Sequence, residues 1–135
     1  MSFNEDEAGE RFAAARVARL ATVGADGQPH LVAVTFALRR NVVVIAIDHK
    51  PKTTTNLKRL RNIQVNNRVS LLVDHYDDDW SQLWWVRADG SAKVVEPSSE
   101  SVGWLAEKYE QYRDRQPEGQ IIWVDVDTWR SWSYV

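Results

Sequence analysis

Six runs of β-branched and other apolar residues, most of them separated by tight turns, constrain the fold of this chain more than any other feature. The runs span residues 17–23, 30–38, 42–47, 69–75, 83–96 and 120–134. The turn sequences at 25–28 and 39–41 join consecutive runs, and such short connections favour antiparallel neighbours. Asp89-Gly90, inside the fifth run, fits either a hairpin or a bulge. The flanking Trp and Val positions favour a bulge in one long bent strand.

Three further segments have the pattern of helices. Residues 4–15 carry apolar side chains at helical spacing, and Asn4 with Glu7 fits a capping box. A short helix is expected at about 54–61 and a longer one at 97–115. About six antiparallel strands with three helices predict an α+β chain, mainly β, that closes into a small barrel.

Composition narrows the class of protein. The 135 residues, 44% hydrophobic and 27% charged, are typical of one globular domain, expected to span 1–135. No apolar run reaches the length of a membrane span and the N-terminus is polar, so we expect a cytoplasmic protein that binds no membrane. The absence of cysteine excludes disulfides, thiolate metal sites and a cysteine nucleophile. The net charge of -2 disfavours nucleic acid as a partner.

Seven tryptophans lie in the second half of the chain, which is unusual for this length. They are Trp80, Trp84, Trp85, Trp104, Trp123, Trp129 and Trp132. Because Trp is large and its indole N–H needs a partner, a surplus indicates an interface or a planar ligand. A purely structural role in the core is the equal alternative.

The segment between Asp48 and Asp74 concentrates positive charge on an acidic background. It contains no acidic residue and six basic ones, which are Lys50, Lys52, Lys58, Arg59, Arg61 and Arg68. Three threonines at 53–55 follow two of the lysines at the expected start of a helix, where free backbone N–H groups favour an anion. The residues alone leave two interpretations open: a phosphate site, or a helix cap beside solvated lysines.

Three segments in this order carry a resemblance to a known family. They are VARLATVGADGQPHLVAVTFAL at 17–38, KPKTTTNLKRLRNIQVNNRVSLLVD at 50–74 and DDDWSQLWWVRADGSAKVVE at 77–96. The chain resembles the pyridoxamine 5′-phosphate oxidase-like flavoproteins, whose fold is the FMN-binding split β-barrel. Within them it is most similar to the branch that uses an 8-hydroxy-5-deazaflavin, coenzyme F420, in place of FMN. The Arg- and Pro-containing C-terminal segment with which pyridoxamine phosphate oxidases hold their substrate has no counterpart here, so vitamin B6 oxidation is not expected.

The resemblance implies a site for the phosphate of the cofactor. It places there the basic residues after the third strand and the first turn of the next helix. These are Lys50, Lys52, Thr53 and Thr54, with Asn56 and Leu57 close behind. The physical reasoning agrees, because a phosphodiester needs several donors and compensating charge.

The resemblance also implies a wall for the flat ring of the cofactor. One strand would supply Val34, Thr35 and Phe36, and the neighbouring strand Ala46, Ile47 and Asp48. The alternative is that many of these residues simply fill the barrel. In a homodimer with sites at the interface, the second subunit would supply Trp80, Trp84 and Arg87.

No nucleophile triad, glycine-rich phosphate loop or paired-carboxylate site stands out, and the three histidines are not spaced as metal ligands. This fits an enzyme whose cofactor carries the chemistry. The expected reaction is hydride transfer between C5 of the deazaflavin and an unsaturated or conjugated organic substrate, with no catalytic side chain assigned. The alternatives are an FMN-binding oxidoreductase on the same fold and a non-catalytic carrier of a flavin or tetrapyrrole.

Overall fold

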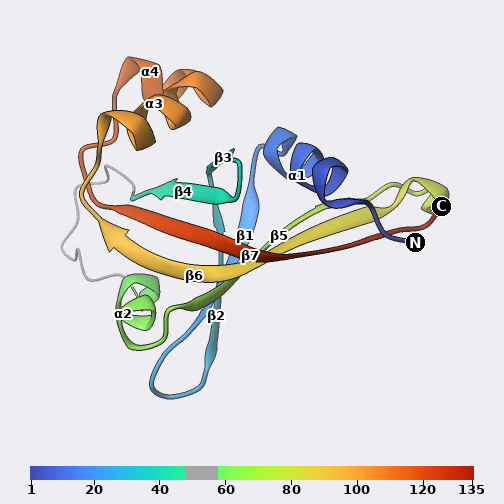
Figure 1. Ribbon diagram of the computed structural model, residues 1–135, viewed down its shortest axis with the longest axis horizontal. Helices are drawn as coiled ribbons and strands as arrows, with labels where there is room; N and C mark the ends of the chain where they lie inside the picture. The colour runs from blue at the N-terminus through green and yellow to red at the C-terminus, as the bar shows by residue number, and fades with distance from the viewer. Residues whose placement is uncertain (48–57) are drawn as a thin grey trace.

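The computed structural model describes residues 1–47 and 58–135. Within them the strands form one antiparallel sheet in the order β2-β1-β5-β6-β7-β4-β3. Their bounds are β1 Ala18–Val23, β2 Pro29–Val34, β3 Ala37–Arg39, β4 Val42–Ala46, β5 Arg68–His75, β6 Trp84–Val95 and β7 Ile121–Ser133. The long strands β6 and β7 run across the molecule, and the β1–β2 hairpin extends away from them (Figure 1). The predicted fold class, a mainly β split barrel, is confirmed.

The predicted single strand at 30–38 is wrong, and the error shows how the sheet curls. Val34, the last residue of β2, pairs with Ala18 of β1, whereas Ala37, the first residue of β3, pairs with Val44 of β4. β2 and β3 therefore lie at opposite ends of the strand order although only Thr35 and Phe36 separate them. One continuous strand cannot pair with both β1 and β4, so the chain breaks and crosses between the two edges.

Strand alternation builds the core. In β5 the side chains of Val69, Leu71 and Val73 are buried, and the residues between them lie on the other face of the sheet. The helix α1, Glu5–Ala14, adds Phe12, whose ring lies 4.9 Å from that of Phe36. Half of the predicted capping box is present: the Asn4 side chain accepts a hydrogen bond from the Glu7 backbone N–H, but the Glu7 carboxylate pairs with Arg11.

The fifth run is one long strand, as expected, and a bulge lies opposite Asp89-Gly90 with its extra residue on β7. Asp89 pairs with Thr128 of β7 and Gly90 pairs with Val126, so Asp127 has no partner residue in β6. β6 and β7 approach so closely here that a Cβ on residue 90 would collide with the carbonyl oxygen of Asp125. Only glycine fits at this position, because there is no room for a side chain.

The predicted helix at 97–115 is two helices, α3 at Ser99–Lys108 and α4 at Glu110–Asp114. Tyr109 between them has an extended backbone, and its hydroxyl accepts a hydrogen bond from the Phe36 N–H and donates one to the Arg16 carbonyl. The buried tyrosine ring and the two hydrogen bonds of its hydroxyl stabilise the fold more than one continuous helix would. Leu105 and Tyr109 pack against β4 and β7 in a second apolar cluster.

The helix α2, Lys58–Val65, extends four residues beyond the predicted end at Arg61. The extra turn is held because Ile63 packs into the core and the buried Asn62 donates to the Thr22 hydroxyl at 3.0 Å. A short 3-10 helix, η1, covers Trp80–Gln82. Among the described residues, no helix combines the length and the apolar character that crossing a membrane requires.

Candidate functional site

The break between β2 and β3 is fixed by two tyrosines from the helical layer. The Thr35 hydroxyl shares a hydrogen bond of 2.8 Å with the Tyr112 hydroxyl, and Tyr109 holds the Phe36 N–H at 3.1 Å. Phe36 is fully buried and presents no exposed surface to a ligand. Val34 is also buried, which leaves Thr35 as the partly exposed side chain of the three predicted here.

The second predicted wall lies at the same end of the barrel. β3 and β4 are antiparallel with Ala37 opposite Val44, so the start of β3 and the end of β4 meet. Ala46 at that end is buried, and the next residue, Ile47, donates its N–H to the Gln120 carbonyl at 3.2 Å. Val34, Phe36 and Ile47 belong to the main core cluster, whereas Ala46, on the alternate face of β4, packs with Leu105 and Tyr109 in the second cluster.

The predicted phosphate site falls on residues that the structure does not describe. Asp48, Lys50, Lys52, Thr53, Thr54, Asn56 and Leu57 all lie outside the described residues. The helix α2, which follows them, is anchored to the β1–β2 turn. Lys58 forms an ion pair with Asp26 at 3.5 Å, and Gly24 lies so close to Asn62 that it has no room for a Cβ.

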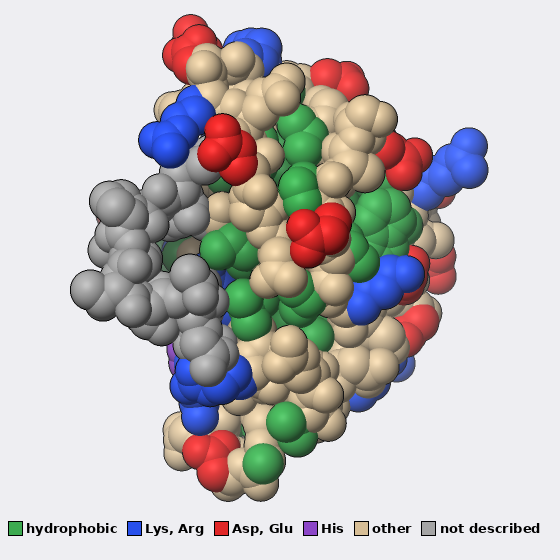
Figure 2. Space-filling model, turned by 90° about the vertical axis from the view of Figure 1, so that its left-hand side faces the viewer, with side chains coloured by type: hydrophobic (Ala, Val, Ile, Leu, Met, Phe, Trp, Pro, Cys, Tyr) green, Lys and Arg blue, Asp and Glu red, His purple; other side chains and the backbone are tan. Residues whose placement is uncertain are grey.

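Charged side chains surround this end of the molecule. Figure 2 views the side formed by α2, α3 and α4, where hydrophobic side chains near the middle of the face are bordered by Lys, Arg, Asp and Glu. The pKa of Asp26 is lowered by the backbone N–H of Gln28 and then by the charge of Lys58. The Lys58 ammonium is thus already paired.

A groove runs along the outward face of β1, β2, β5 and β6, and we call it the sheet-face groove. Its larger part has a volume of about 540 Å³ and is lined by Arg19, Ala21, Leu31, Ser70, Leu71, Leu72, Asp74, Trp85 and Arg87. It continues past Ser70 and Arg87 into a hollow of about 400 Å³ beside Pro29 and Arg68. Leu31 at its rim is 66% exposed. The groove combines an apolar floor with charged edges.

Arg87 is held in this groove by an acid. Its guanidinium donates to both carboxylate oxygens of Asp89, at 2.9 and 3.1 Å, and Ser70 donates to the same carboxylate at 2.6 Å. Burial alone would raise the pKa of Asp89, but these hydrogen bonds from Arg87 and Ser70 outweigh it and keep the pKa below its usual value. The pair stays ionised at neutral pH.

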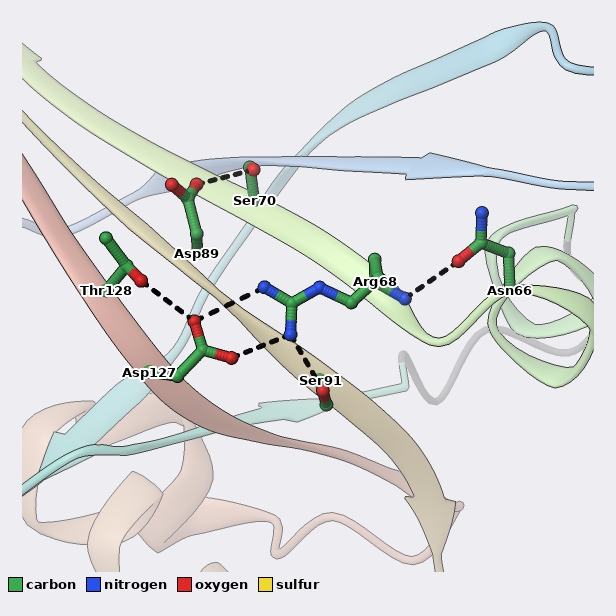
Figure 3. A network of polar contacts seen from close by, with 7 residues as sticks. All are labelled: Asn66, Arg68, Ser70, Asp89, Ser91, Asp127 and Thr128. Atoms are coloured by element: carbon green, nitrogen blue, oxygen red, sulfur yellow. Dashed lines mark hydrogen bonds and ion pairs between the residues drawn. The ribbon is translucent and has the colours of Figure 1, made fainter.

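A second ion pair borders the groove at the bulge (Figure 3). Arg68 contacts the two oxygens of Asp127 at 2.7 and 3.3 Å and also donates to the Ser91 hydroxyl at 2.9 Å. The hydroxyl of Thr128 donates to the same carboxylate. The hydrogen bond from Arg68 lowers the pKa of Asp127.

Trp84 and Arg87, predicted together, lie on opposite faces of β6. Trp84 packs against the core and is stacked with His75 at a centroid distance of 6.1 Å. Trp85 instead lies beside Arg87 in the sheet-face groove. Trp80, in η1, is 61% exposed. Successive side chains of a strand point to opposite faces, so residues 84 and 87 lie on different faces and residues 85 and 87 on the same one. This alternation could have predicted from the sequence that Trp85, and not Trp84, lies beside Arg87.

Sequence reasoning also missed Tyr109 and Tyr112, which fix the strand break. Nothing in the helical pattern of 97–115 indicated that the Tyr109 hydroxyl would bond to the Phe36 backbone. Among the described residues, no group of three His, Asp or Glu side chains is placed to hold a metal ion.

Comparison with known proteins gives a family and a fold. The family model described as pyridoxamine 5′-phosphate oxidase matches residues 5–133. No curated protein matches the chain in sequence.

Solved structures with this fold come from several bacteria. A conserved hypothetical protein from Mycobacterium tuberculosis is 24% identical, with a TM-score of 0.73 over 97% of this chain and 85% of that one. A FAD binding protein from Mycobacterium smegmatis is 16% identical, with a TM-score of 0.69 over 100% and 99%. The heme storage protein HutZ from Vibrio cholerae is 19% identical, with a TM-score of 0.71 over 96% and 93%. At these identities the likeness establishes a shared fold.

Proposed function

Because this chain belongs to the pyridoxamine 5′-phosphate oxidase family, we propose that it is an oxidoreductase that binds a flavin-type cofactor, specifically the deazaflavin coenzyme F420. The observation that carries the proposal is that the start of β3 lies beside the end of β4, with Val34, Phe36 and Ile47 in one apolar cluster. That end is where the chain enters the segment richest in Lys and Thr. A flat ring needs backbone edges and small side chains, and its phosphate needs the donors that follow.

The proposed roles follow from the chemistry of each group. Lys50, Lys52, Thr53 and Thr54 would hold the phosphate, with Asn56 and Leu57 beside them and Asp48 at the ring wall. The hydroxyl of the partly exposed Thr35 would meet the polar edge of the ring. When bound, the deazaflavin would supply hydride chemistry at its C5 atom to an unsaturated or conjugated organic substrate. The barrel wall would orient the substrate and exclude water.

A homodimer is part of the proposal. The sheet-face groove exposes Leu31, Leu72 and Trp85 on one side of the sheet, a surface suited to packing against a second copy. Trp80 and Arg87 would then reach the site from the second subunit, whereas Trp84, which packs against the core of its own subunit, would not. The ion pair with Asp89 preorganises Arg87 for that role.

Two structural neighbours support a rival cofactor. Their descriptions name FAD binding, in Mycobacterium smegmatis and in Mesorhizobium loti, which favours a true flavin such as FMN or FAD on this fold. The heme storage protein from Vibrio cholerae favours a non-catalytic carrier. A carrier would bind its ligand tightly and show no turnover.

A titration of the purified protein with the deazaflavin coenzyme, FMN, FAD and heme separates these functions. Quenching of tryptophan fluorescence reports binding. Micromolar or tighter binding of the deazaflavin alone would support the proposal and justify a screen of acceptors. Preference for FMN or FAD would move the protein to flavin chemistry, and preference for heme, or binding of none of the four, would remove the catalytic proposal.

Substitution of Lys52 by Ala tests the phosphate site. The loss of a charged hydrogen bond should weaken cofactor binding by about 1–3 kcal/mol. Lys93→Ala is a matched control, because Lys93 is an exposed lysine on β6 that no part of the proposed site includes. Equal affinity in Lys52→Ala and wild type would remove Lys52 from the site.

A further inference from the structure

Lys108, the last residue of α3, has an ammonium group without a hydrogen-bond partner. Its Nζ atom is buried and lies 3.6 Å from the centroid of the Phe36 ring and 5.2 Å from that of Tyr109. No atom of the described residues accepts a hydrogen bond from it. The faces of aromatic rings attract a cation, but they do not replace the hydrogen bonds that an ammonium makes in water.

Two arginines lie beside this lysine. The Arg16 guanidinium lies 4.7 Å from the centroid of the same Tyr109 ring, and Arg39 lies 5.9 Å from the ring centroid of Trp104. We call Arg16, Arg39 and Lys108 the α3 cation cluster. The pKa of Lys108 is lowered to about 8, first by burial of the amine and then by the positive charges of Arg16 and Arg39. Lys108 is therefore still mostly charged at pH 7.

The cluster is under-neutralised within the described part of the chain. Arg39 pairs with Glu107 at 3.1 Å, and that carboxylate is 70% exposed. Arg16 is exposed and forms no ion pair with any described residue. The carbonyl oxygens near the end of α3, which would otherwise favour a cation, accept hydrogen bonds from Arg113 at Ala106 and Glu107. Two positive charges remain without a carboxylate.

Hydroxyl groups lie close to the same cluster. Tyr109 lies against Tyr112, with ring centroids 5.6 Å apart, and the Tyr112 hydroxyl is bonded to that of Thr35. Because either hydroxyl of this pair can donate to the other, the pair retains one proton to offer elsewhere. Lys108 and Arg16 thus offer the positive charge that binds an oxyanion, and a hydroxyl donor lies on Tyr112, the ring next to Tyr109.

We propose that Arg16 and Lys108 form a binding site for a carboxylate or phosphate group of a small anionic ligand, with Arg39 as a supporting charge. Arg16 supplies exposed donors at the surface, and Lys108 supplies the charge beneath it. Two sources of such a group are compatible with the site: the acidic tail of a cofactor, or an acid group on the substrate. The site does not depend on the proposed function, because it is built from residues outside the predicted cofactor set.

The test follows Lys108 itself by NMR. The Cε signal of Lys108, assigned by its loss in Lys108→Met, is recorded while sodium phosphate or glutarate is added at constant ionic strength. The Lys52→Ala background keeps the predicted phosphate segment from contributing. We expect saturable shifts and a higher pKa for Lys108, because a bound anion favours its charged form. Arg16→Gln should weaken anion affinity about tenfold or more.

Lys93→Met is the matched control. Lys93 also lies over an aromatic ring, 6.0 Å from the centroid of Trp123, but it is exposed and outside the cluster. Its substitution should leave anion affinity unchanged. No saturable shift of the Lys108 signal with either anion, or equal affinity in wild type and Arg16→Gln, would overturn the proposal. Because Arg16 is exposed, its variant remains informative even if Lys108→Met fails to fold.

A second arm identifies the source of the anion. Arg16→Gln is titrated with the complete deazaflavin coenzyme and with the same deazaflavin lacking its acidic tail. Weaker binding of the complete coenzyme alone would assign the site to the tail. Unchanged binding of both, with a raised KM for a carboxylate-bearing substrate, would assign it to the substrate. If neither deazaflavin binds, the proposed function fails while the NMR titration still decides the anion site.

Discussion

Arg68 of β5 reaches across β6 to contact Asp127, the residue of β7 that the bulge leaves without a partner in β6. The ion pair spans three strands and lies beside the glycine at which β6 and β7 approach most closely. Both side chains are about half exposed, so solvent screens their charges. The close approach at Gly90 is therefore expected to matter more for stability than the ion pair above it.

Gly90→Ala should destabilise the protein severely. The added Cβ would collide with backbone atoms of Asp125, which cannot move without disrupting the β6–β7 pairing. We expect a loss of about 3 kcal/mol or more, or failure to fold, measured by urea unfolding. Gly103→Ala on α3 is the control, because nothing lies near its Cβ position and alanine should stabilise that helix by about 0.5–1 kcal/mol. Equal stability of Gly90→Ala and wild type would contradict the close approach.

Lys108 should make stability depend on pH in the alkaline range. Its folded pKa of about 8 lies below the ordinary value of 10.5, so the unfolded chain binds more protons between these values. The free energy of unfolding should therefore rise as the pH increases from 8 to 10.5, by about 1–2 kcal/mol once solvent screening of the partly exposed side chain is allowed for.

The measurement is urea unfolding of wild type and Lys108→Met across that pH range. The difference between the two proteins isolates Lys108 from other groups that titrate there. If the unfolding free energies of the two proteins change in the same way with pH, the pKa of Lys108 is not lowered in the folded protein.

Asp89→Asn should remove an acid-dependent part of the stability. The folded pKa of Asp89 is lowered, because the hydrogen bonds of Arg87 and Ser70 outweigh the effect of burial. The stabilisation is present above the unfolded pKa of the carboxyl and is lost as the pH falls through the folded value. Wild type should exceed the variant at pH 7 by about 1 kcal/mol, with the gap closing as the pH falls below the ordinary value of 3.8. The measurement is thermal unfolding of wild type and Asp89→Asn at a series of pH values. A stability difference that does not change with pH would show that it does not come from the ionised Asp89 carboxylate.

Leu31→Glu tests the proposed dimer. A charge in the middle of a packed apolar surface should separate the subunits, and sedimentation velocity should show a monomer. Val65→Glu is a closely matched control, since Val65 is 65% exposed, as Leu31 is 66% exposed, but lies on α2 away from the groove. A wild-type protein that sediments as a monomer, or a Leu31→Glu variant that remains a dimer, would remove the sheet face from the proposal.

Local pattern predicted most of the elements because each depends on near neighbours. The Asn4 cap, the turns and the bent strand around Asp89-Gly90 follow from residue type and strand alternation. The break at Thr35–Phe36 could not be predicted in this way. Its residues read as continuous strand, and only the pairing of β2 and β3 with different partners requires the interruption.

The candidate site was predicted less completely than the fold. Val34, Phe36 and Ile47 share the main core cluster, but Ala46 packs in the second cluster, and Phe36 is covered by Phe12 of a distant helix. Trp84 was expected beside Arg87 although alternation puts it on the other face of β6. The cluster around Lys108 joins residues from three separate parts of the chain, and no spacing within one element reveals such a combination.

The two-residue link Thr35–Phe36 has a consequence for how the chain reaches its native state. The β1–β2 and β3–β4 hairpins are adjacent in sequence and can each form locally, yet β5, β6 and β7 must come between them in the final sheet. Until those later strands are inserted, β1 and β4 both present unpaired edges. Such edges recruit strands from other molecules, so a chain in which only the two hairpins had formed would expose two sites for aggregation.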